Sequence, residues 1–159
     1  MTNESGRTML EMLGVIAIIG VLTVGAISFI NFGLQTFRVT SVFTLIETTA
    51  SDVSDLYSWK RGYPTADQQE SMGRTICENK IFDKACLSTN PATILTELGN
   101  LTVTPDDESQ FTITLYSVPY TACNQLITMD WVNVKLKATS ATDKTSCNDT
   151  TTDLIFTAY

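Results

Sequence analysis

A long apolar run opens the chain and gives way to an amphipathic pattern. Residues 12–34 contain no charged side chain, and 23 such residues are enough to cross a bilayer as a helix. Beyond Leu34, apolar side chains recur every three or four positions, as on one stripe of a helix. The stripe consists of Val39, Phe43, Ile46, Ala50, Val53 and Tyr57. No proline or pair of glycines interrupts the chain before Gly62, so we predict one helix over residues 7–59.

The rest of the chain contains several strand-like segments. Each has either alternating apolar and polar side chains or a short apolar run, as β-strands do. These segments are residues 101–104, 111–116, 132–137 and 154–159. We expect them to form an antiparallel sheet, with an acidic turn at residues 105–109. Residues 61–89 contain glycine, proline and many charged side chains and are predicted to be a loop.

Two short helices are predicted in the same part of the chain. Pro119 suits the start of a helix that runs through Ile127. Asn90–Pro91 is a typical helix start and Gly99 a typical stop, so residues 92–98 predict a second short helix. The fold class is therefore α+β. A long N-terminal helix, apolar in its first half and amphipathic in its second half, packs on an antiparallel sheet head.

The composition limits the cellular compartment and the classes of partner that fit this chain. The net charge is −7, which argues against binding of nucleic acid through a basic surface. Four cysteines, Cys77, Cys86, Cys123 and Cys147, follow the apolar run. An even count in an exported domain predicts two disulfides, with three possible pairings. A metal site is the alternative, but the chain has no histidine and the cysteine spacings match no zinc motif.

The sequence contains no recognisable catalytic constellation. Without histidine the commonest general base is missing, and the serine and cysteine triads with it. We therefore expect no enzyme activity, no cofactor and no metal. The acidic residues Asp106, Asp107 and Glu108 lack the ligand spacing of a known calcium loop, so we expect a solvated turn there. Trp59 and Trp131 are expected to fill the core or an interface.

A single acid stands at the head of the apolar run. Glu11 lies five residues after Gly6, with Arg7 between them, and a carboxylate at a membrane edge is costly enough to indicate a function. A short leader that ends in glycine, four more residues, a glutamate and an apolar run resemble the class III signal of type IV pilins and pseudopilins. The chain differs from the usual pattern in having Arg7 after the glycine and an acidic leader. A secretory signal peptide has a shorter apolar core, whereas an ordinary membrane anchor gives Glu11 no role.

The resemblance implies how the chain is processed. A prepilin peptidase is expected to cleave after Gly6 and to methylate the new amino terminus at Arg7, and Glu11 is expected to pair with the terminal amine of a neighbouring subunit. Residues 1–6 are then the leader, residues 7–34 the transmembrane and assembly half of the helix, and residues 35–159 the head with the amphipathic half. The precursor is expected in the bacterial inner membrane, beside the pilus assembly machinery, and the processed subunit in the extracellular pilus.

The order of elements in about the last 50 residues resembles the C-terminal half of type IVb pilins. That resemblance implies a disulfide between Cys123 and Cys147, which leaves Cys77 for Cys86. The implied function is that of a homopolymeric structural subunit of a type IV pilus, most like type IVb, that supports adhesion, motility or cell–cell contact. The alternatives are a minor pilin, a type II secretion pseudopilin and a membrane-anchored, exported binding module.

Overall fold

The computed structural model describes residues 4–59, 62–79, 81–82, 86–129, 131, 136–140, 147 and 151–158, with side chains from Met9 onward except at residues 137–140. The chain divides into two compact units, Met1–Phe37 and Arg38–Tyr159. The helices are α1 (Glu4–Ser58), α2 (Gln69–Glu78) and α3 (Tyr120–Thr128), with the short 3₁₀ helix η1 (Ala66–Gln68). The strands are β1 (Ser88–Thr89), β2 (Ala92–Leu95), β3 (Asn100–Asp107), β4 (Gln110–Pro119), β5 (Leu136–Ser140) and β6 (Thr151–Ala158). The predicted α+β class is confirmed.

The first unit consists of the apolar half of α1. Every side chain from Met9 to Phe37 is exposed, including large ones such as Phe29 and Phe32. Among the described residues, this is the one helix long and apolar enough to cross a membrane. An apolar surface of this extent needs lipid or other protein chains to cover it.

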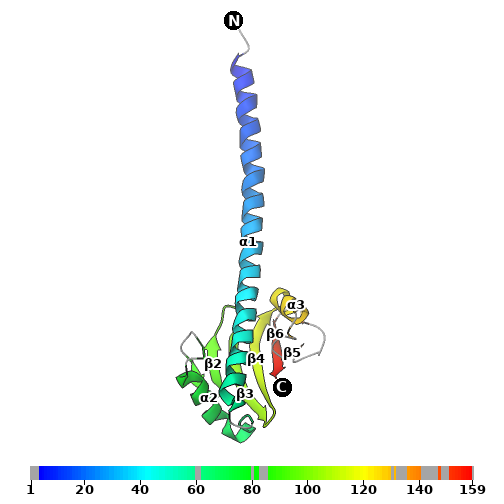
Figure 1. The fold of residues 1–159 in the computed structure, drawn as a ribbon. Coiled ribbons are helices and arrows are strands. Elements are labelled where there is room, and N and C mark those ends of the chain that lie inside the picture. The colour runs from blue at the N-terminus through cyan, green and yellow to red at the C-terminus, as the bar shows by residue number, and fades with distance from the viewer. Residues whose placement is uncertain are drawn as a thin grey trace. The chain divides into compact units, whose positions relative to one another are not determined.

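In the second unit, the amphipathic half of α1 packs on one face of the sheet (Figure 1). Its buried apolar side chains are Val39, Val42, Ile46, Ala50, Val53 and Tyr57. The stripe predicted from the sequence is thus confirmed, except that Phe43 is only partly buried and Val42 is fully covered. Burial of one stripe, rather than helix propensity, is what fixes a helix of this kind in place.

Two chains of aromatic rings join α1 to the sheet. The Trp131 ring lies 4.5 Å from Phe43 on α1 and 4.7 Å from Phe156 on β6, measured between ring centroids. The Tyr63 ring similarly lies 5.9 Å from Tyr57 and 4.9 Å from Phe111. Tilted ring pairs at these distances are favourable beyond the area that they bury.

Tyr57 also connects α1 with α2. Burial raises the pKa of the Tyr57 phenol, and its hydrogen bond with Thr75 acts in the opposite direction. The phenol therefore stays protonated at neutral pH and can serve as a hydrogen-bond donor.

The sheet has six strands in the order β1-β2-β3-β4-β6-β5, and every neighbouring pair is antiparallel. The register aligns apolar side chains across four strands in two rows: Ile94, Leu101, Leu115 and Leu154, and Ala92, Val103, Ile113 and Phe156. All eight are buried. Because side chains alternate between faces, the opposite face carries threonines, among them Thr93, Thr102, Thr104, Thr112, Thr114 and Thr157.

The prediction of a loop over residues 61–89 is wrong, because this segment contains η1, α2 and β1. The helix α2 packs against β1, β2 and β3 and buries Met72, Gly73 and Ile76 on one side. In the loop prediction Gly73 is a break, yet it lies inside the helix, where a Cβ would overlap the carbonyl oxygen of Thr89. This glycine therefore allows close contact between a helix and a strand.

The prediction of a helix over residues 92–98 is also wrong. Ala92 and Ile94 are buried while Thr93 is half-buried and Leu95 exposed, which is the two-residue alternation of a strand. Pairing of β2 between β1 and β3 outweighs the local helix-start signal of Asn90–Pro91.

The remaining predicted elements differ from the structure mainly at their ends. Strand β3 continues through Pro105 to Asp107, so the acidic turn shrinks to two residues. Pro105 is tolerated because the register of β3 and β4 shifts directly after it, where a missing N–H costs little. The helix predicted after Pro119 is confirmed as α3. Part of the strand predicted at residues 132–137 lies outside the described residues, and β5 begins at Leu136.

Candidate functional site

Glu11 lies in the first quarter of α1. Its side chain is exposed, and none of the residues that the structure describes forms an ion pair with it. Gly6 and Arg7 belong to the same helix, but the Arg7 side chain lies outside the described part. The structure thus places Glu11 at the start of an uncharged helical surface, with its carboxylate available to a group from elsewhere.

Hydroxyl groups in the apolar half of α1 are paired within the helix. Thr23 Oγ1 donates a hydrogen bond to the carbonyl oxygen of Ile19 at 2.7 Å, and Ser28 Oγ donates to that of Val24 at 3.1 Å. Thr36 Oγ1 donates to the carbonyl oxygen of Phe32 in the same way. Such bonds to the preceding turn allow hydroxyls to enter hydrocarbon without an unsatisfied donor.

The glycines of this half-helix are not required for any close contact among the described residues. A Cβ added at Gly14, Gly20, Gly25 or Gly33 would meet no atom within 4 Å. Each glycine costs a solvated helix about 1 kcal/mol relative to alanine. Small residues on a membrane helix allow other helices to approach closely, which is the physical use left to them.

Two disulfides crosslink the head, with the pairing that the resemblance implies. Cys77 at the end of α2 is bonded to Cys86, which precedes β1. Cys123 on α3 is bonded to Cys147, which precedes β6. Disulfides form and persist in oxidising compartments outside the cytosol. Together with the apolar helix, they indicate an exported protein that is associated with a membrane.

The two disulfides should stabilise the head unequally. Replacing Cys123 and Cys147 with serine should lower the free energy of unfolding by about 3.5 kcal/mol, and replacing Cys77 and Cys86 by about 2.5 kcal/mol. The difference arises because the closed loops span 24 and 9 residues, and the longer loop restricts the unfolded chain more. Urea unfolding of the detergent-solubilised chain, followed by tryptophan fluorescence, measures both values. A larger loss for the Cys77–Cys86 pair would contradict this ranking.

The acidic turn between β3 and β4 is held by its own hydrogen bonds. The backbone N–H and the hydroxyl of Ser109 each donate to Asp107 Oδ1 at 2.7 Å. These bonds favour the charged carboxylate and lower the pKa of Asp107. Over the described residues, no three acidic or cysteine side chains come together in a way that could hold a metal ion.

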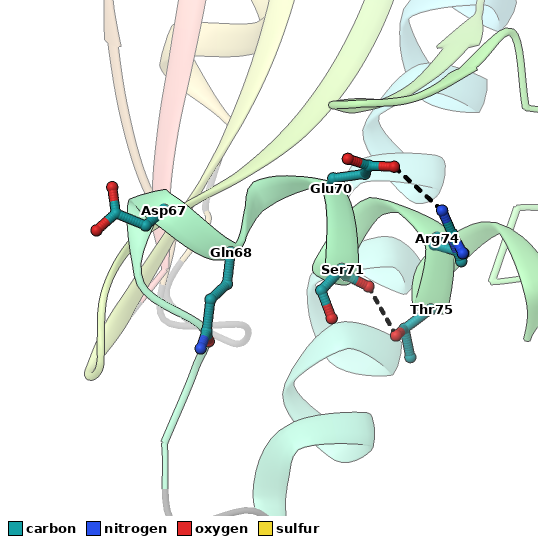
Figure 2. Close-up of a pocket in the computed structure, with 6 residues that line it drawn as sticks. All are labelled: Asp67, Gln68, Glu70, Ser71, Arg74 and Thr75. Carbon is teal, nitrogen blue, oxygen red and sulfur yellow. Dashed lines mark hydrogen bonds and ion pairs between the residues drawn. The ribbon is translucent and has the colours of Figure 1, made fainter.

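A shallow groove of about 420 Å³ lies over η1 and the start of α2 (Figure 2). Its lining residues are Asp67, Gln68, Glu70, Ser71, Arg74 and Thr75. Figure 2 shows Glu70 directed toward Arg74, with an ion pair of 3.1 Å between Oε1 and Nη2. None of the lining side chains is buried, and an exposed pair of this kind contributes little. We assign no ligand to this groove.

The two tryptophans occupy different surroundings. Trp131 is buried in the core, as predicted, and its Nε1 donates a hydrogen bond to the carbonyl oxygen of Leu126 at 2.9 Å. Trp59 is 92% exposed at the end of α1, so it does not belong to the core. For Trp59 the alternative, a place in an interface, stays a prediction.

The chain matches no family model, and no curated protein matches it. What the structure establishes is a pilin-like architecture: a long N-terminal apolar helix followed by an antiparallel sheet with two disulfides.

Proposed function

We propose that this chain is a structural subunit of a type IV pilus, most like type IVb. In this proposal a prepilin peptidase removes residues 1–6 and methylates Arg7, and the subunit then polymerises through the apolar half of α1. The observation that carries the proposal is the fully exposed, uncharged surface of residues 12–37, headed by the single carboxylate of Glu11. Lipid tails offer that carboxylate no partner, and none of the described residues forms an ion pair with it.

The driving force would be an exchange of lipid contacts for helix–helix contacts. Lipid tails are as apolar as leucine, so apolar transfer from lipid to a helix bundle gains little. Close packing and polar pairing must therefore supply the specificity. The exposed glycines permit the packing, and the internally bonded hydroxyls carry no unsatisfied donor into either environment.

Glu11 would determine which arrangement of neighbours is stable. A carboxylate inside a bundle of helices is costly unless a cation lies next to it. Cleavage after Gly6 creates an amine at Arg7, four residues before Glu11 in the sequence. A neighbour in the correct register brings such an amine to Glu11, whereas a neighbour out of register leaves the acid unpaired. The acid thereby couples processing of the leader to the geometry of assembly.

The proposal is tested by purified filaments. Cells that express the chain should yield sheared filaments that are visible by electron microscopy. Gel analysis of these filaments should show the chain as their dominant protein. Mass spectrometry should find an amino terminus at Arg7 that carries one methyl group. A small share of the filament protein would indicate a minor pilin or pseudopilin instead. An intact Met1, in cells that process other pilins, would refute the proposal in favour of a membrane-anchored binding module.

A further inference from the structure

Two amide side chains interrupt the apolar half of α1 near its end. Asn31 and Gln35 are both exposed, and neither forms a side-chain hydrogen bond with any residue that the structure describes. They differ in this respect from Thr23 and Ser28, whose hydroxyls are bonded to their own helix. Asn31 and Gln35 are four positions apart and therefore project from the same side of α1.

The amides lie on a regular seam of this helix. Seven residues follow one another at alternating spacings of three and four, which is the a and d pattern of two helices that pack side by side. The seam consists of Gly14, Ala17, Val21, Val24, Ser28, Asn31 and Gln35. None of them is leucine, isoleucine or phenylalanine, so a second helix can approach closely along the seam. The two amides fall at its carboxyl end.

A carboxamide is complementary to another carboxamide. Each carries N–H donors and a carbonyl acceptor, so two identical amides can satisfy each other. In a water-poor helix bundle, an unpaired amide is costly. Copies of this chain enter the membrane with the same orientation, so their helices run parallel. The shift of four residues that brings Arg7 of one copy to Glu11 of the next also brings Asn31 of one copy to the level of Gln35 of the next. A second copy therefore offers the complement that the chain itself lacks.

We propose that Asn31 and Gln35 form an interhelical amide contact between parallel copies of this chain and fix the register of their apolar helices. The inference rests on the proposed function, in that copies assemble through this half of α1. It adds a second polar contact at the opposite end of the apolar run from Glu11. A helix that slips by one heptad would lose the amide contact even where its apolar surface stays covered.

The test measures self-association of the full chain in lipid vesicles. Chains labelled with donor or acceptor dyes are mixed at several protein-to-lipid ratios, and energy transfer gives the dissociation constant. Asn31→Leu/Gln35→Leu should weaken association about tenfold. The exchanged variant Asn31→Gln/Gln35→Asn keeps both amides and should stay within about threefold of the unaltered chain. The matched control Thr23→Val/Thr36→Val removes two internally bonded hydroxyls that lie off the seam and should change association less than twofold.

Two outcomes would overturn the inference. One is equal association of the leucine variant and the unaltered chain, which would show that water or lipid headgroups satisfy the amides. The other is an unaltered chain that does not self-associate in vesicles. Filaments and processing at Arg7 are scored separately in cells. If Asn31→Leu/Gln35→Leu still gives filaments in cells and unchanged self-association in vesicles, the amide contact is refuted while the pilus function stands. An unprocessed terminus would refute the pilus function whatever the vesicle result.

Discussion

Replacing Glu11 with alanine is expected to abolish filaments, or to reduce the filament yield by about a hundredfold or more, while the head stays folded. Removing one partner of a desolvated ion pair typically costs about 3–5 kcal/mol, because the other charge is left unpaired. In a filament that penalty falls on every subunit, since each terminal amine would lack its acid. Electron microscopy and quantitation of sheared filaments measure the loss. Circular dichroism of the purified variant measures whether the head is folded.

The control for Glu11 is another exposed acid of the same helix. Asp52→Ala removes one carboxylate from the amphipathic half of α1 and changes the net charge by the same amount. It should leave filament yield nearly unchanged. Glu11→Gln separates charge from hydrogen bonding, and we expect it to resemble the alanine variant because an amide does not neutralise an ammonium group. Normal filaments from either Glu11 variant would count decisively against the assembly mechanism.

Replacing Phe156 with alanine is expected to lower the free energy of unfolding of the head by about 3–5 kcal/mol. Phe156 is completely buried on β6, directly opposite Ile113 on β4, and its ring packs on Trp131. The alanine variant would leave a cavity between the sheet and the aromatic chain that reaches α1. Urea unfolding of the detergent-solubilised chain, followed by the fluorescence of Trp131, measures the change.

The neighbouring residue on the same strand provides a matched control. Thr157 is half-buried on the opposite face of the sheet, where it pairs with Thr112. Thr157→Ala should cost less than about 1 kcal/mol, because no large buried volume is lost. A slip of β6 by one residue would exchange the two faces and reverse this order. Equal losses for the two variants would therefore contradict the register.

The sequence predicts the elements whose packing repeats a simple period. The amphipathic half of α1 is recognisable because six apolar residues from Val39 to Tyr57 fall on one stripe. The strand β4 is recognisable because Phe111, Ile113 and Leu115 alternate with polar side chains. In both cases the local pattern and the tertiary contacts agree, and consistency between the two levels is what makes an element predictable.

Elements held by a few distant contacts are not predictable in this way. The helix α2 has only Met72 and Ile76 as large buried residues, and its Gly73 serves a contact with Thr89 that is 16 residues away in the sequence. Strand β2 begins after a proline that signals a helix start. Its extended form depends on pairing with β3, which no local window contains.

The residues of the candidate site also differ in how far the sequence alone predicts them. The spacing of Gly6, Arg7 and Glu11 is a sequence signal, and the structure adds only that Glu11 is exposed and that no described residue pairs with it. Composition alone does not identify Asn31 and Gln35 as interface residues, because two amides near the end of an apolar run are typical of an ordinary membrane boundary. Their heptad spacing is the signal that identifies them. The contrast with the internally bonded hydroxyls emerges only from the hydrogen bonds of the structure.

The position of the four cysteines has a mechanical consequence. All of them follow Ser58, so no covalent crosslink ties α1 to the sheet. A load pulled along the N-terminal helix is resisted there by noncovalent contacts, such as the packing of Ile46 and Val53 and the hydrogen bond of Tyr57 with Thr75. Under tension, that part of α1 could detach and dock again without any covalent bond being cut, while the disulfides still crosslink α2 and α3 to the segments before β1 and β6. The chain could thus yield reversibly between α1 and the sheet and keep the rest of its head intact.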